Sequence, residues 1–490
     1  MPISASGKPA ARLGFAAVIG AVGVLCFAPF GFFWLAPAIW LGLFQLLRAA
    51  GSVRQAALCG LAFGLGFFLT GVSWVYVSLS VFGGMPWWLA GIAAFLFCAV
   101  MAVFPMLAGA LFKRWQPETF WRQVLYFAAL IAAVDWLRSW IFTGFPWLAV
   151  GYSQAPTSPL AGFAPLLGVH GLSLLVALAG AALARWRSGL IIVGLLAASG
   201  FGLRQILWTQ PVGEPVSVAL IQGNIPQEMK FRPEAFIRTL NLYLELIERH
   251  PAQLTILPET SLPIFFDQLP PAYLEALNDA VRAHGGNLIT GALTGDHDAY
   301  WNSAVSLGSS PTQTYSKRHL VPFGEFIPPG FAWFMAYANI PMSGFSRGPD
   351  AQPPLALGGQ QVAVNICYED VFGEEIIRAL PQAGILVNLS NTAWFGRSLA
   401  QPQHLQIARM RAVETGRPML RATNTGMTAA ISADGSLQAA LPPFTQGVLE
   451  TEVRGYQGMT PYARYGNLGF LVLLALVLLA SQWPRKPRAR

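Results

Sequence analysis

Cys367 is the residue of this sequence whose type and position most directly suggest covalent chemistry. It is the one cysteine in a long, comparatively polar stretch, and it directly follows the strand-like run Val362–Ile366. Two interpretations stay open on this fact alone: a free reactive thiol, or a buried inert thiol at a strand end. A helix expected to begin shortly after Cys367 favours the reactive thiol, because a helix N-terminus stabilises a thiolate. The other three cysteines fall in long apolar runs, where we interpret them as small buried residues: Cys26, Cys59 and Cys98.

A cysteine nucleophile needs a base and a group that holds the developing oxyanion. Glu259 follows the apolar run Leu254–Leu257, which puts a carboxylate at the C-terminal end of a predicted strand. Lys317 precedes the string VPFGE. Each charge taken singly is more typical of a solvated surface, but the two together with Cys367 form a candidate catalytic set. The histidines of this stretch share no pattern, and we interpret most of them as surface residues: His250, His284, His297, His319 and His404.

The composition indicates that the candidate catalytic set belongs to a membrane-bound chain. Of the 490 residues, 54% are hydrophobic and only 11% are charged, whereas soluble domains carry about 25% charged residues. Residues 209–465 hold 16 Lys and Arg against 21 Asp and Glu, and the remainder holds 15 against 2. The positive excess therefore borders apolar segments, as in membrane proteins, and does not form a nucleic-acid-binding face.

Eight apolar runs are near the length that crosses a bilayer, about 20 residues. They lie near residues 11–30, 32–48, 55–80, 86–112, 123–143, 160–184, 189–208 and 467–483. Lys and Arg fall in alternate connections, which puts both chain termini in the cytoplasm and the 209–465 segment outside. We expect a membrane domain over 1–208 with seven spans, an extracytoplasmic catalytic domain over 209–465, and an eighth span with a basic tail over 466–490. Asp135 and Arg138, one turn apart in the fifth run, are interpreted as a structural ion pair rather than a proton path.

The outer segment predicts an α/β fold. Strands are expected over 216–221, 254–257, 288–291, 304–307, 362–366, 385–389, 419–422, 429–431 and 448–451, with helices over 236–249, 269–283, 373–380 and 401–415. Strands alternate with helices early and become consecutive late, which is typical of a layered α/β domain. The aromatic and Met-rich segment Val321–Gly348 fits neither element. It is either an ordinary hydrophobic subcluster or an amphipathic flap that dips into the membrane interface.

Five strings together resemble the apolipoprotein N-acyltransferase family: GNIPQ (223–227), LPET (257–260), YSKRHLVPFGEF (315–326), ICYED (366–370) and NTAWFG (391–396). The resemblance covers the whole chain, because that family also has eight spans with an outer domain before the last. It implies that the outer domain is a nitrilase-superfamily α-β-β-α sandwich with a Glu-Lys-Cys triad.

The resemblance also implies a role for each matching residue. Glu259 corresponds to the general base, Lys317 to the lysine that stabilises the oxyanion, and Cys367 to the nucleophile. The supporting residues of the pocket are implied to be Glu325, Tyr368, Glu369 and Phe231. Tyr368 would lend its backbone N–H to the oxyanion hole, and Phe231 stands where the family often has tryptophan.

The implied reaction is acyl transfer at the bacterial inner membrane, with the catalytic domain in the periplasm. A phospholipid, typically phosphatidylethanolamine, would acylate the cysteine, and the N-terminal α-amine of an S-diacylglyceryl-cysteine lipoprotein would take the acyl chain. No metal-ligand spacing or nucleotide-binding pattern is present in the sequence, so we expect no cofactor. Two alternatives remain: a membrane-tethered amidase or hydrolase with the same triad, and a transporter with an accessory outer domain.

Overall fold

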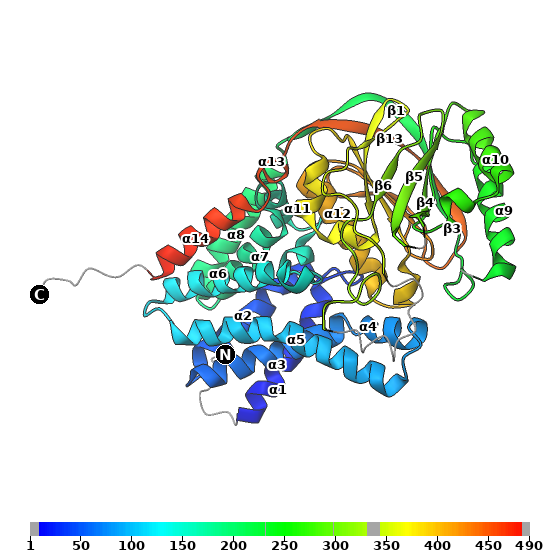
Figure 1. The fold of residues 1–490 in the computed structure, drawn as a ribbon. Helices are drawn as coiled ribbons and strands as arrows, with labels where there is room; N and C mark the ends of the chain where they lie inside the picture. The colour runs from blue at the N-terminus through cyan, green and yellow to red at the C-terminus, as the bar shows by residue number, and fades with distance from the viewer. Residues whose placement is uncertain (1–8, 231, 297, 331–343, 483–490) are drawn as a thin grey trace, which may run out of the picture. The chain divides into compact units, whose positions relative to one another are not determined.

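The computed structural model describes residues 9–230, 232–296, 298–330 and 344–482, and the chain divides into two compact units (Figure 1). The first unit comprises Met1–Ser73, Gly91–Leu207 and Tyr465–Arg490. The second comprises Trp74–Ala90 and Trp208–Arg464. The sequence placed Trp74–Ala90 in the membrane domain, whereas here this segment packs with the α/β residues.

The first unit is built from apolar helices. Six helices among the described residues are long and apolar enough to cross a membrane: Pro9–Cys26, Val53–Gly71, Trp87–Arg114, Phe120–Arg138, Pro159–Ala182 and Trp186–Leu203. Two more apolar helices, Phe33–Ala49 and Leu468–Gln482, are shorter, so eight spans stay a prediction. Helix α3 (Val53–Gly71) ends before the end of the apolar run 55–80. The rest of that run forms a short helix, α4 (Trp74–Val77), and a π-helical turn, η3 (Ser78–Phe82).

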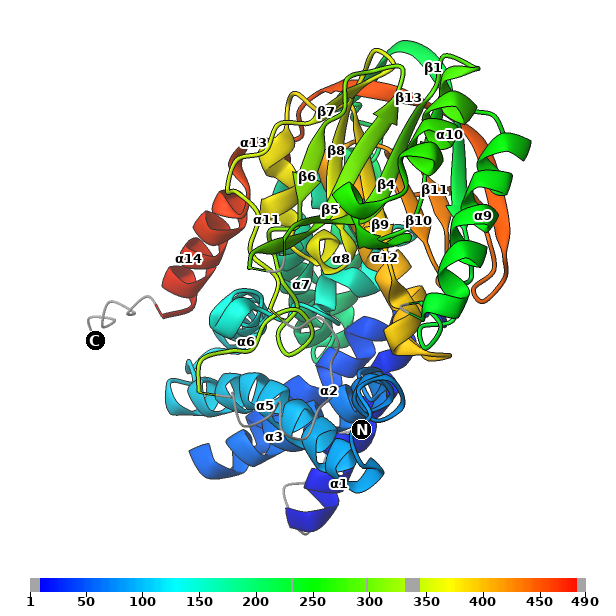
Figure 2. The same cartoon turned by 45° about the vertical axis from the view of Figure 1, so that its right-hand side comes forward.

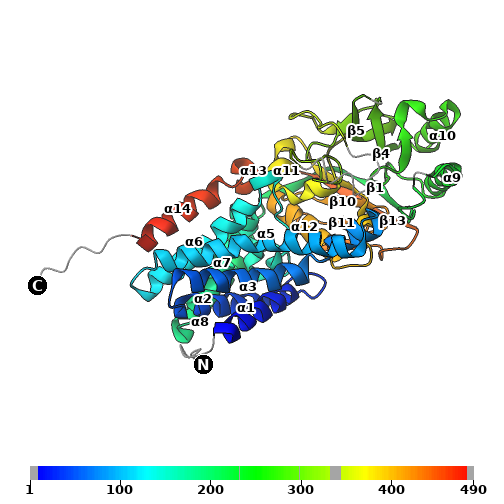
Figure 3. The same cartoon turned by 60° about the horizontal axis from the view of Figure 1, so that its bottom comes forward.

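Small residues let these helices approach closely. Helix α1 (Pro9–Gly23) lies against α3, and α2 (Ala36–Ala49) and α6 (Phe120–Arg138) lie against α7 (Ala164–Ala182), as Figure 3 shows. A Cβ on Gly20 would meet the Phe63 carbonyl oxygen at 2.1 Å, and one on Gly66 would meet that of Ala17 at 2.0 Å. These glycines therefore set the spacing of α1 and α3, as small residues do at helix contacts in membranes.

The predicted ion pair of the fifth run is present in this unit. Arg138 Nη2 lies 2.7 Å from Asp135 Oδ1, and both side chains are buried. The other Asp135 oxygen accepts bonds from Val150 N at 2.8 Å and Ser173 Oγ at 2.7 Å. These contacts tie the end of α6 to the loop that follows it, which is a structural role.

The second unit contains two sheets. The first has the order β13-β1-β2-β4-β5-β6, with β3 also pairing with β4; the second has the order β12-β11-β10-β9-β8-β7. The strands of the first sheet are β1 (Thr209–Gln222), β2 (Leu254–Ile256), β3 (Leu262–Phe265), β4 (Asn287–Gly295), β5 (Tyr300–Gly308), β6 (Thr314–Ser316) and β13 (Gly447–Gly458). Those of the second are β7 (Leu355–Leu357), β8 (Gln360–Ile366), β9 (Ile385–Ser390), β10 (Met419–Thr423), β11 (Ala429–Ile431) and β12 (Leu437–Ala440).

Alternate residues of the strands explain the layering. Val218 and Leu220 of one sheet share a buried core with Val364 and Val387 of the other, so the sheets pack face to face. Helices α9 (Pro233–Arg249) and α10 (Pro271–Arg282) cover the outer face of the first sheet, as Figure 2 shows. Helices α11 (Gly373–Ile376) and α12 (Ala400–Thr415) cover that of the second. The predicted α/β domain is confirmed, with helices outside two central sheets.

Candidate active site

Cys367 begins a short 3-10 helix, η9 (Cys367–Val371), at the end of β8. The predicted strand-to-helix position is thus what the structure shows. The Cys367 backbone has φ of +54°, a left-handed conformation that few residues other than glycine adopt. The side chain is partly exposed, unlike the other three cysteines, which are buried. The turn presents the Cys367 side chain at the edge of the sheet. Residues with a strained backbone are often found at active sites.

Two other strand ends bring Glu259 and Lys317 to the same place. Glu259 lies three residues beyond β2 in a loop whose Leu257 N donates to Ile289 O at 2.8 Å. Lys317 directly follows β6, and its backbone N donates to Asn302 O at 2.8 Å. Both side chains are buried, Glu259 at 6% and Lys317 at 1% exposure. Two strands of one sheet, β2 and β6, therefore bring a buried carboxylate and a buried ammonium to the same place, although β4 and β5 lie between them in the sheet.

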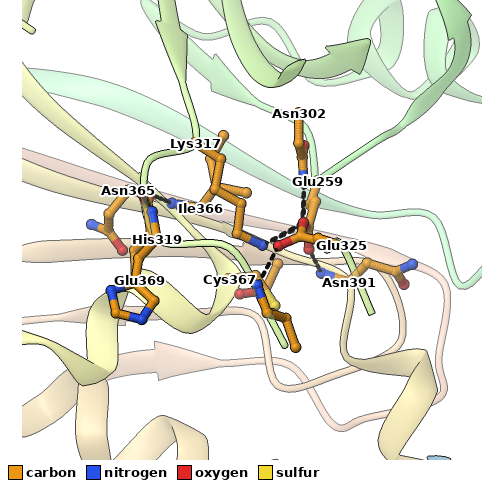
Figure 4. A network of polar contacts seen from close by, with 12 residues as sticks. Glu259, Asn302, Lys317, His319, Glu325, Asn365, Ile366, Cys367, Glu369 and Asn391 are labelled. Atoms are coloured by element: carbon orange, nitrogen blue, oxygen red, sulfur yellow. Dashed lines mark hydrogen bonds and ion pairs between the residues drawn. The ribbon is translucent and has the colours of Figure 1, made fainter. Parts of the chain in front are cut away.

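The charged groups meet in one cluster. Lys317 Nζ lies 3.3 Å from Glu259 Oε1 and 2.8 Å from Glu325 Oε1. Asn302 Nδ2 donates to both of these carboxylate oxygens, at 2.8 and 3.0 Å. Asn391 N donates to the second oxygen of Glu259, Oε2, at 2.7 Å. Figure 4 shows Glu259, Lys317 and Glu325 converging with Cys367 beside them.

The cluster keeps Glu259 ionised. Burial alone would raise the pKa of this carboxyl, but the Lys317 and Lys230 cations and the bonds from Asn302 and Asn391 together lower it below its usual range. Lys317 is held in its charged form in the same way. Burial would lower the pKa of its ammonium, and the adjoining Glu325 and Glu259 carboxylates raise it. The site at rest therefore contains a carboxylate base and an ammonium donor.

The thiol has the opposite tendency. Burial and the Glu259 carboxylate raise the pKa of Cys367, against the effect of Lys317. The resting nucleophile is therefore a neutral thiol, which a base must deprotonate as it attacks. Among the hydrogen bonds of the described residues, Glu259 Oε2 accepts one, from Asn391. A carboxylate oxygen has two acceptor sites, so Oε2 keeps one acceptor site beyond the bond from Asn391.

Lys317 keeps a donor for the reaction. Its ammonium has three N–H groups, and within the described part of the chain two are directed at Glu259 and Glu325. The third can donate to an oxygen that gains charge when the thiol adds to a carbonyl, which is how oxyanions are stabilised. The arrangement is thus suited to nucleophilic addition at an ester, amide or thioester.

Glu325 belongs to the loop that closes on this cluster. Its Oε1 accepts the Lys317 bond, and its Oε2 accepts from Val321 N at 2.8 Å. Farther along, Gly344 N and Phe345 N both donate to the Glu325 carbonyl, and Gly348 N donates to Lys317 O, each at 2.9 Å. The described ends of the Val321–Gly348 segment are therefore attached to the cluster of Glu259, Lys317 and Glu325. Residues 331–343 lie outside the described residues, so the two interpretations of this segment remain open.

Glu369 is buried but does not join the cluster. It accepts bonds from Tyr315 Oη at 3.0 Å, Arg318 N at 2.7 Å, His319 N at 3.1 Å and Ile366 N at 2.6 Å. Burial raises the pKa of this carboxyl, against the effect of those donors. It joins the strand end that carries Cys367 to the segment that carries Lys317, which makes it a positioning residue.

Tyr368 and Phe231 are the two remaining residues predicted to line the pocket. The ring of Tyr368 is buried and packs edge-on against Phe372, with ring centroids 5.1 Å apart, and lies near His319. Phe231 lies outside the described residues. The Tyr368 ring therefore contributes packing beside the nucleophile.

Lys230 is a second buried lysine that the sequence reasoning missed. Its Nζ donates to the Glu259 carbonyl at 3.0 Å, and its side chain is 4% exposed. Burial lowers the pKa of Lys230 to about 8, although the Glu259 carboxylate and Cys367 act to raise it. The signal was available, because Lys230 follows the GNIPQ string by three positions. Asn302 had no such signal, since its role depends on strand pairing between β5 and β6.

The strings GNIPQ and NTAWFG meet around Glu259. Asn391 Nδ2 donates to Gln227 Oε1 at 2.8 Å, and Asn424 Nδ2 donates to Asn391 Oδ1 at 3.2 Å. Asn424 Oδ1 in turn accepts from Ile225 N at 2.9 Å. GNIPQ and NTAWFG therefore form a frame that holds the Asn391 N–H against Glu259.

The histidine interpretation needs correction at two positions. The His319 side chain is 15% exposed, its Nδ1 lies 3.0 Å from Glu375 Oε1, and its ring stacks on Phe372. His404 is buried at 1% exposure, with Nε2 2.7 Å from Asp370 Oδ1, because a carboxylate and Arg421 compensate its polar ring. His284 is exposed and His250 is partly exposed, as expected, whereas His297 lies outside the described residues. Among the residues that the structure describes, no group of three or more His, Cys, Asp or Glu could hold a metal ion.

Comparison with known proteins covers both parts of the chain. The family model of the apolipoprotein N-acyltransferase N-terminal domain matches residues 19–182, and that of carbon-nitrogen hydrolases matches residues 217–460. An apolipoprotein N-acyltransferase of Nitrosomonas europaea is 50% identical over 96% of this chain and 97% of its own. One of Ralstonia nicotianae is 46% identical over 96% and 94%.

Solved structures are similar to a smaller part. A carbon-nitrogen hydrolase of Helicobacter pylori is 18% identical, covers 49% of this chain and 88% of its own, and has a TM-score of 0.37. The NitFhit protein of C. elegans is 17% identical, covers 50% and 62%, and has a TM-score of 0.41.

Proposed function

This chain belongs to the apolipoprotein N-acyltransferase family, and we propose that it moves an acyl chain through a thioester on Cys367. The donor is a membrane phospholipid, with phosphatidylethanolamine as the expected head group. The acceptor is the N-terminal α-amine of an S-diacylglyceryl-cysteine lipoprotein. One observation carries the proposal: a partly exposed thiol beside a buried carboxylate and ammonium that each keep bonding capacity.

The first half-reaction breaks an ester and forms a thioester. Glu259 Oε2 takes the Cys367 proton as Sγ attacks the ester carbonyl carbon. The third N–H of Lys317 donates to the oxyanion that results. When the tetrahedral intermediate collapses, the C–O bond breaks and the proton on Glu259 goes to the leaving glycerol oxygen, which releases a lysophospholipid.

The second half-reaction uses the same groups in reverse. A neutral α-amine attacks the thioester carbonyl, and Glu259 takes the proton that the amine loses. The C–S bond breaks, the proton returns to the Cys367 sulfur, and an amide remains. The enzyme ends in its starting state, so the scheme predicts ping-pong kinetics.

The membrane placement is part of the proposal. We place both termini in the cytoplasm of a bacterial inner membrane, eight spans in the bilayer and the sandwich in the periplasm, on the strength of the basic loops. Both substrates then lie in the leaflet next to the sandwich. The six long apolar helices and the family membership support a membrane enzyme.

The test uses the full-length chain in detergent with phospholipid labelled in one acyl chain. Intact mass should show one added acyl chain on the protein, absent in Cys367→Ala, and a diacylated lipopeptide should then remove it and become labelled. Free fatty acid as the sole labelled product would establish a hydrolase instead. Full function of Cys367→Ala would remove the thioester from the mechanism and favour a transporter.

A further inference from the structure

A row of buried polar side chains crosses the second sheet behind the nucleophile. Asn365, Asn388 and Arg421 are direct neighbours on the parallel strands β8, β9 and β10. Their exposures are 3%, 0% and 1%. Strands covered on both faces are normally apolar, and the proposed chemistry does not use any of these three residues.

Hydrogen bonds fix the orientation of the Asn388 amide. Its Nδ2 donates to Asn365 Oδ1 at 2.6 Å and to the Cys367 carbonyl at 3.1 Å. Its Oδ1 accepts from Arg421 Nη1 at 2.9 Å and from Ser390 Oγ at 2.6 Å. Two donors and two acceptor sites are the full capacity of an amide, so rotation of the group would break four bonds at once.

Arg421 is itself held by two groups. Its Nη1 donates to Asp370 Oδ2 at 2.8 Å, and its Nη2 lies 2.8 Å from His404 Nδ1. Arginine only donates, so His404 Nδ1 must accept, and the His404 proton must be on Nε2, where it donates to Asp370 Oδ1. The imidazole is therefore neutral, and the Arg421 charge is balanced by Asp370, which lies three residues after Cys367.

A hydrogen bond to the Cys367 carbonyl affects the conformation of the proposed nucleophile itself. Cys367 has φ of +54°, a conformation that costs a residue with a side chain about 1 kcal/mol or more. The peptide unit is planar and trans, so its C=O and N–H point in opposite directions. A donor that fixes the Cys367 C=O therefore also fixes the direction of the Tyr368 N–H and limits rotation at the nucleophile.

We propose that Asn388, held in place by Arg421, is a positioning residue for the Cys367 nucleophile. It fixes the plane of the Cys367–Tyr368 peptide, and with it the approach of Sγ to the substrate carbonyl and the direction of the adjoining N–H. This inference rests on the proposed function, because it concerns the rate at which Cys367 becomes acylated. A row that served stability alone would leave that rate unchanged in folded protein.

Two isosteric variants separate these roles. In Asn388→Asp the new carboxylate still accepts from Arg421, which keeps it ionised, but it can no longer donate to the Cys367 carbonyl. In Asn365→Asp one carboxylate oxygen still accepts from Asn388, while the bond from Asn365 Nδ2 to Val387 O is lost. Both variants add one buried carboxyl group to the same row, but only the first loses the contact with Cys367.

The measurement is single-turnover thioacylation of the full-length enzyme by labelled phospholipid in mixed micelles, followed by intact mass, with Tm and the KM for phospholipid. We expect Asn388→Asp to acylate about 30- to 100-fold more slowly with KM unchanged, since small misplacements at a reacting centre cost about this much. Asn365→Asp should lower Tm comparably and stay within about threefold of wild type. Acylation of Asn388→Asp at the wild-type rate, or equal loss in both variants, would overturn the inference.

A milder variant keeps the test possible should Asn388→Asp fail to fold. Ser390→Ala removes one of the two bonds that hold Asn388 Oδ1 and adds no charge. It should slow acylation about threefold to tenfold, the rate equivalent of a hydrogen bond of about 1 kcal/mol. An unchanged rate would overturn the inference while leaving the proposed function intact. Absence of any thioester in wild type would overturn both.

Discussion

Asp135 and Arg138 form a buried ion pair 2.7 Å apart in the helical unit, and Lys317 forms two with Glu259 and Glu325 in the sandwich, at 3.3 and 2.8 Å. In the helical unit the remaining bonds run to fixed groups of the fold. Arg138 donates to the carbonyls of Phe145 and Trp147, the latter at 2.7 Å, and Asp135 accepts from Val150 N. In the sandwich Lys317 and Glu259 keep bonding capacity, and Cys367 lies beside them (Figure 4).

The difference shows how the same charged groups come to serve different ends. Removing charges from water costs several kcal/mol per ion, and both clusters recover this through pairing. The Asp135–Arg138 pair gains further stabilisation from hydrogen bonds to main-chain groups and fixes a loop. The cluster in the sandwich keeps one N–H on Lys317, which we propose for the oxyanion, and one acceptor site on Glu259 Oε2, which we propose for the Cys367 proton. Unused bonding capacity beside a thiol, rather than burial or charge, distinguishes the proposed catalytic cluster from the structural one.

The largest test of this comparison is a pair of isosteric neutralisations. Glu259→Gln removes the base, and kcat should fall about 10²- to 10⁴-fold, the usual value of a positioned base. Asp135→Asn leaves Arg138 without its counter-charge, and the free energy of unfolding should fall by about 3 kcal/mol with kcat of the folded enzyme unchanged. Steady-state kinetics and thermal unfolding in detergent measure both. If Asp135→Asn lost activity at unchanged Tm, the two clusters would not differ as described.

Glu369→Gln examines a saturated carboxylate within the sandwich itself. The amide would direct N–H groups toward backbone donors such as Ile366 N and Arg318 N, so the free energy of unfolding should fall by about 1 to 3 kcal/mol. Because Glu369 joins the segments of Lys317 and Cys367, kcat should also fall, by about 10²-fold, with KM retained. Tyr315→Phe removes one donor to Glu369 without moving either segment and serves as the milder control. A KM effect without loss of kcat would mean that Glu369 contacts substrate.

Part of the fold could be predicted from the sequence alone. Strands such as 216–221 and 385–389 were predictable because apolar, β-branched residues run through them. Strands β3, β6, β7 and β12 were missed, and their three or four residues give no periodicity. Strands β2 and β11 are equally short and were predicted only because their residues form apolar runs. Helix α12 was predicted, but its buried polar side chains were not, because their burial depends on partners from other strands.

The site was predictable to a similar depth. Glu259 and Cys367 could be singled out because each adjoins the end of a predicted strand and a specific string, and Lys317 because it lies in a specific string. The groups that tune them could not: the donor to Glu259 Oε2 is the backbone N of Asn391, and a backbone N–H has no signature in residue types. The Asn388 contact with Cys367 likewise depends on strand register.

Glu325→Gln should have a smaller effect on the rate. The amide oxygen can still accept from Lys317, but a charged acceptor becomes neutral, which costs about 1 kcal/mol and lowers kcat about fivefold to tenfold. The pKa of Lys317, which Glu325 raises more than Glu259 does, should fall back toward its ordinary value while staying alkaline, so Lys317 keeps its charge at neutral pH. Steady-state kinetics at pH 7 test the rate effect, and an unchanged kcat in Glu325→Gln would separate Glu325 from the function of Lys317.

Lys230→Met should have the smallest effect on the rate at neutral pH and a distinct effect on the pH dependence. Burial lowers the pKa of Lys230 from 10.5 to about 8, so between those values the unfolded chain binds more protons at this site than the folded chain does. The free energy of unfolding of the wild type, relative to that of Lys230→Met, should therefore rise by about 3 kcal/mol over that pH interval. Below pH 8 the difference between the two proteins should not change with pH. Other titrating groups are common to both proteins and cancel in the difference. The acid limb of kcat should move to higher pH in Lys230→Met, because Lys230 helps to lower the pKa of Glu259; identical pH profiles would show that the second lysine acts on neither the fold nor the base.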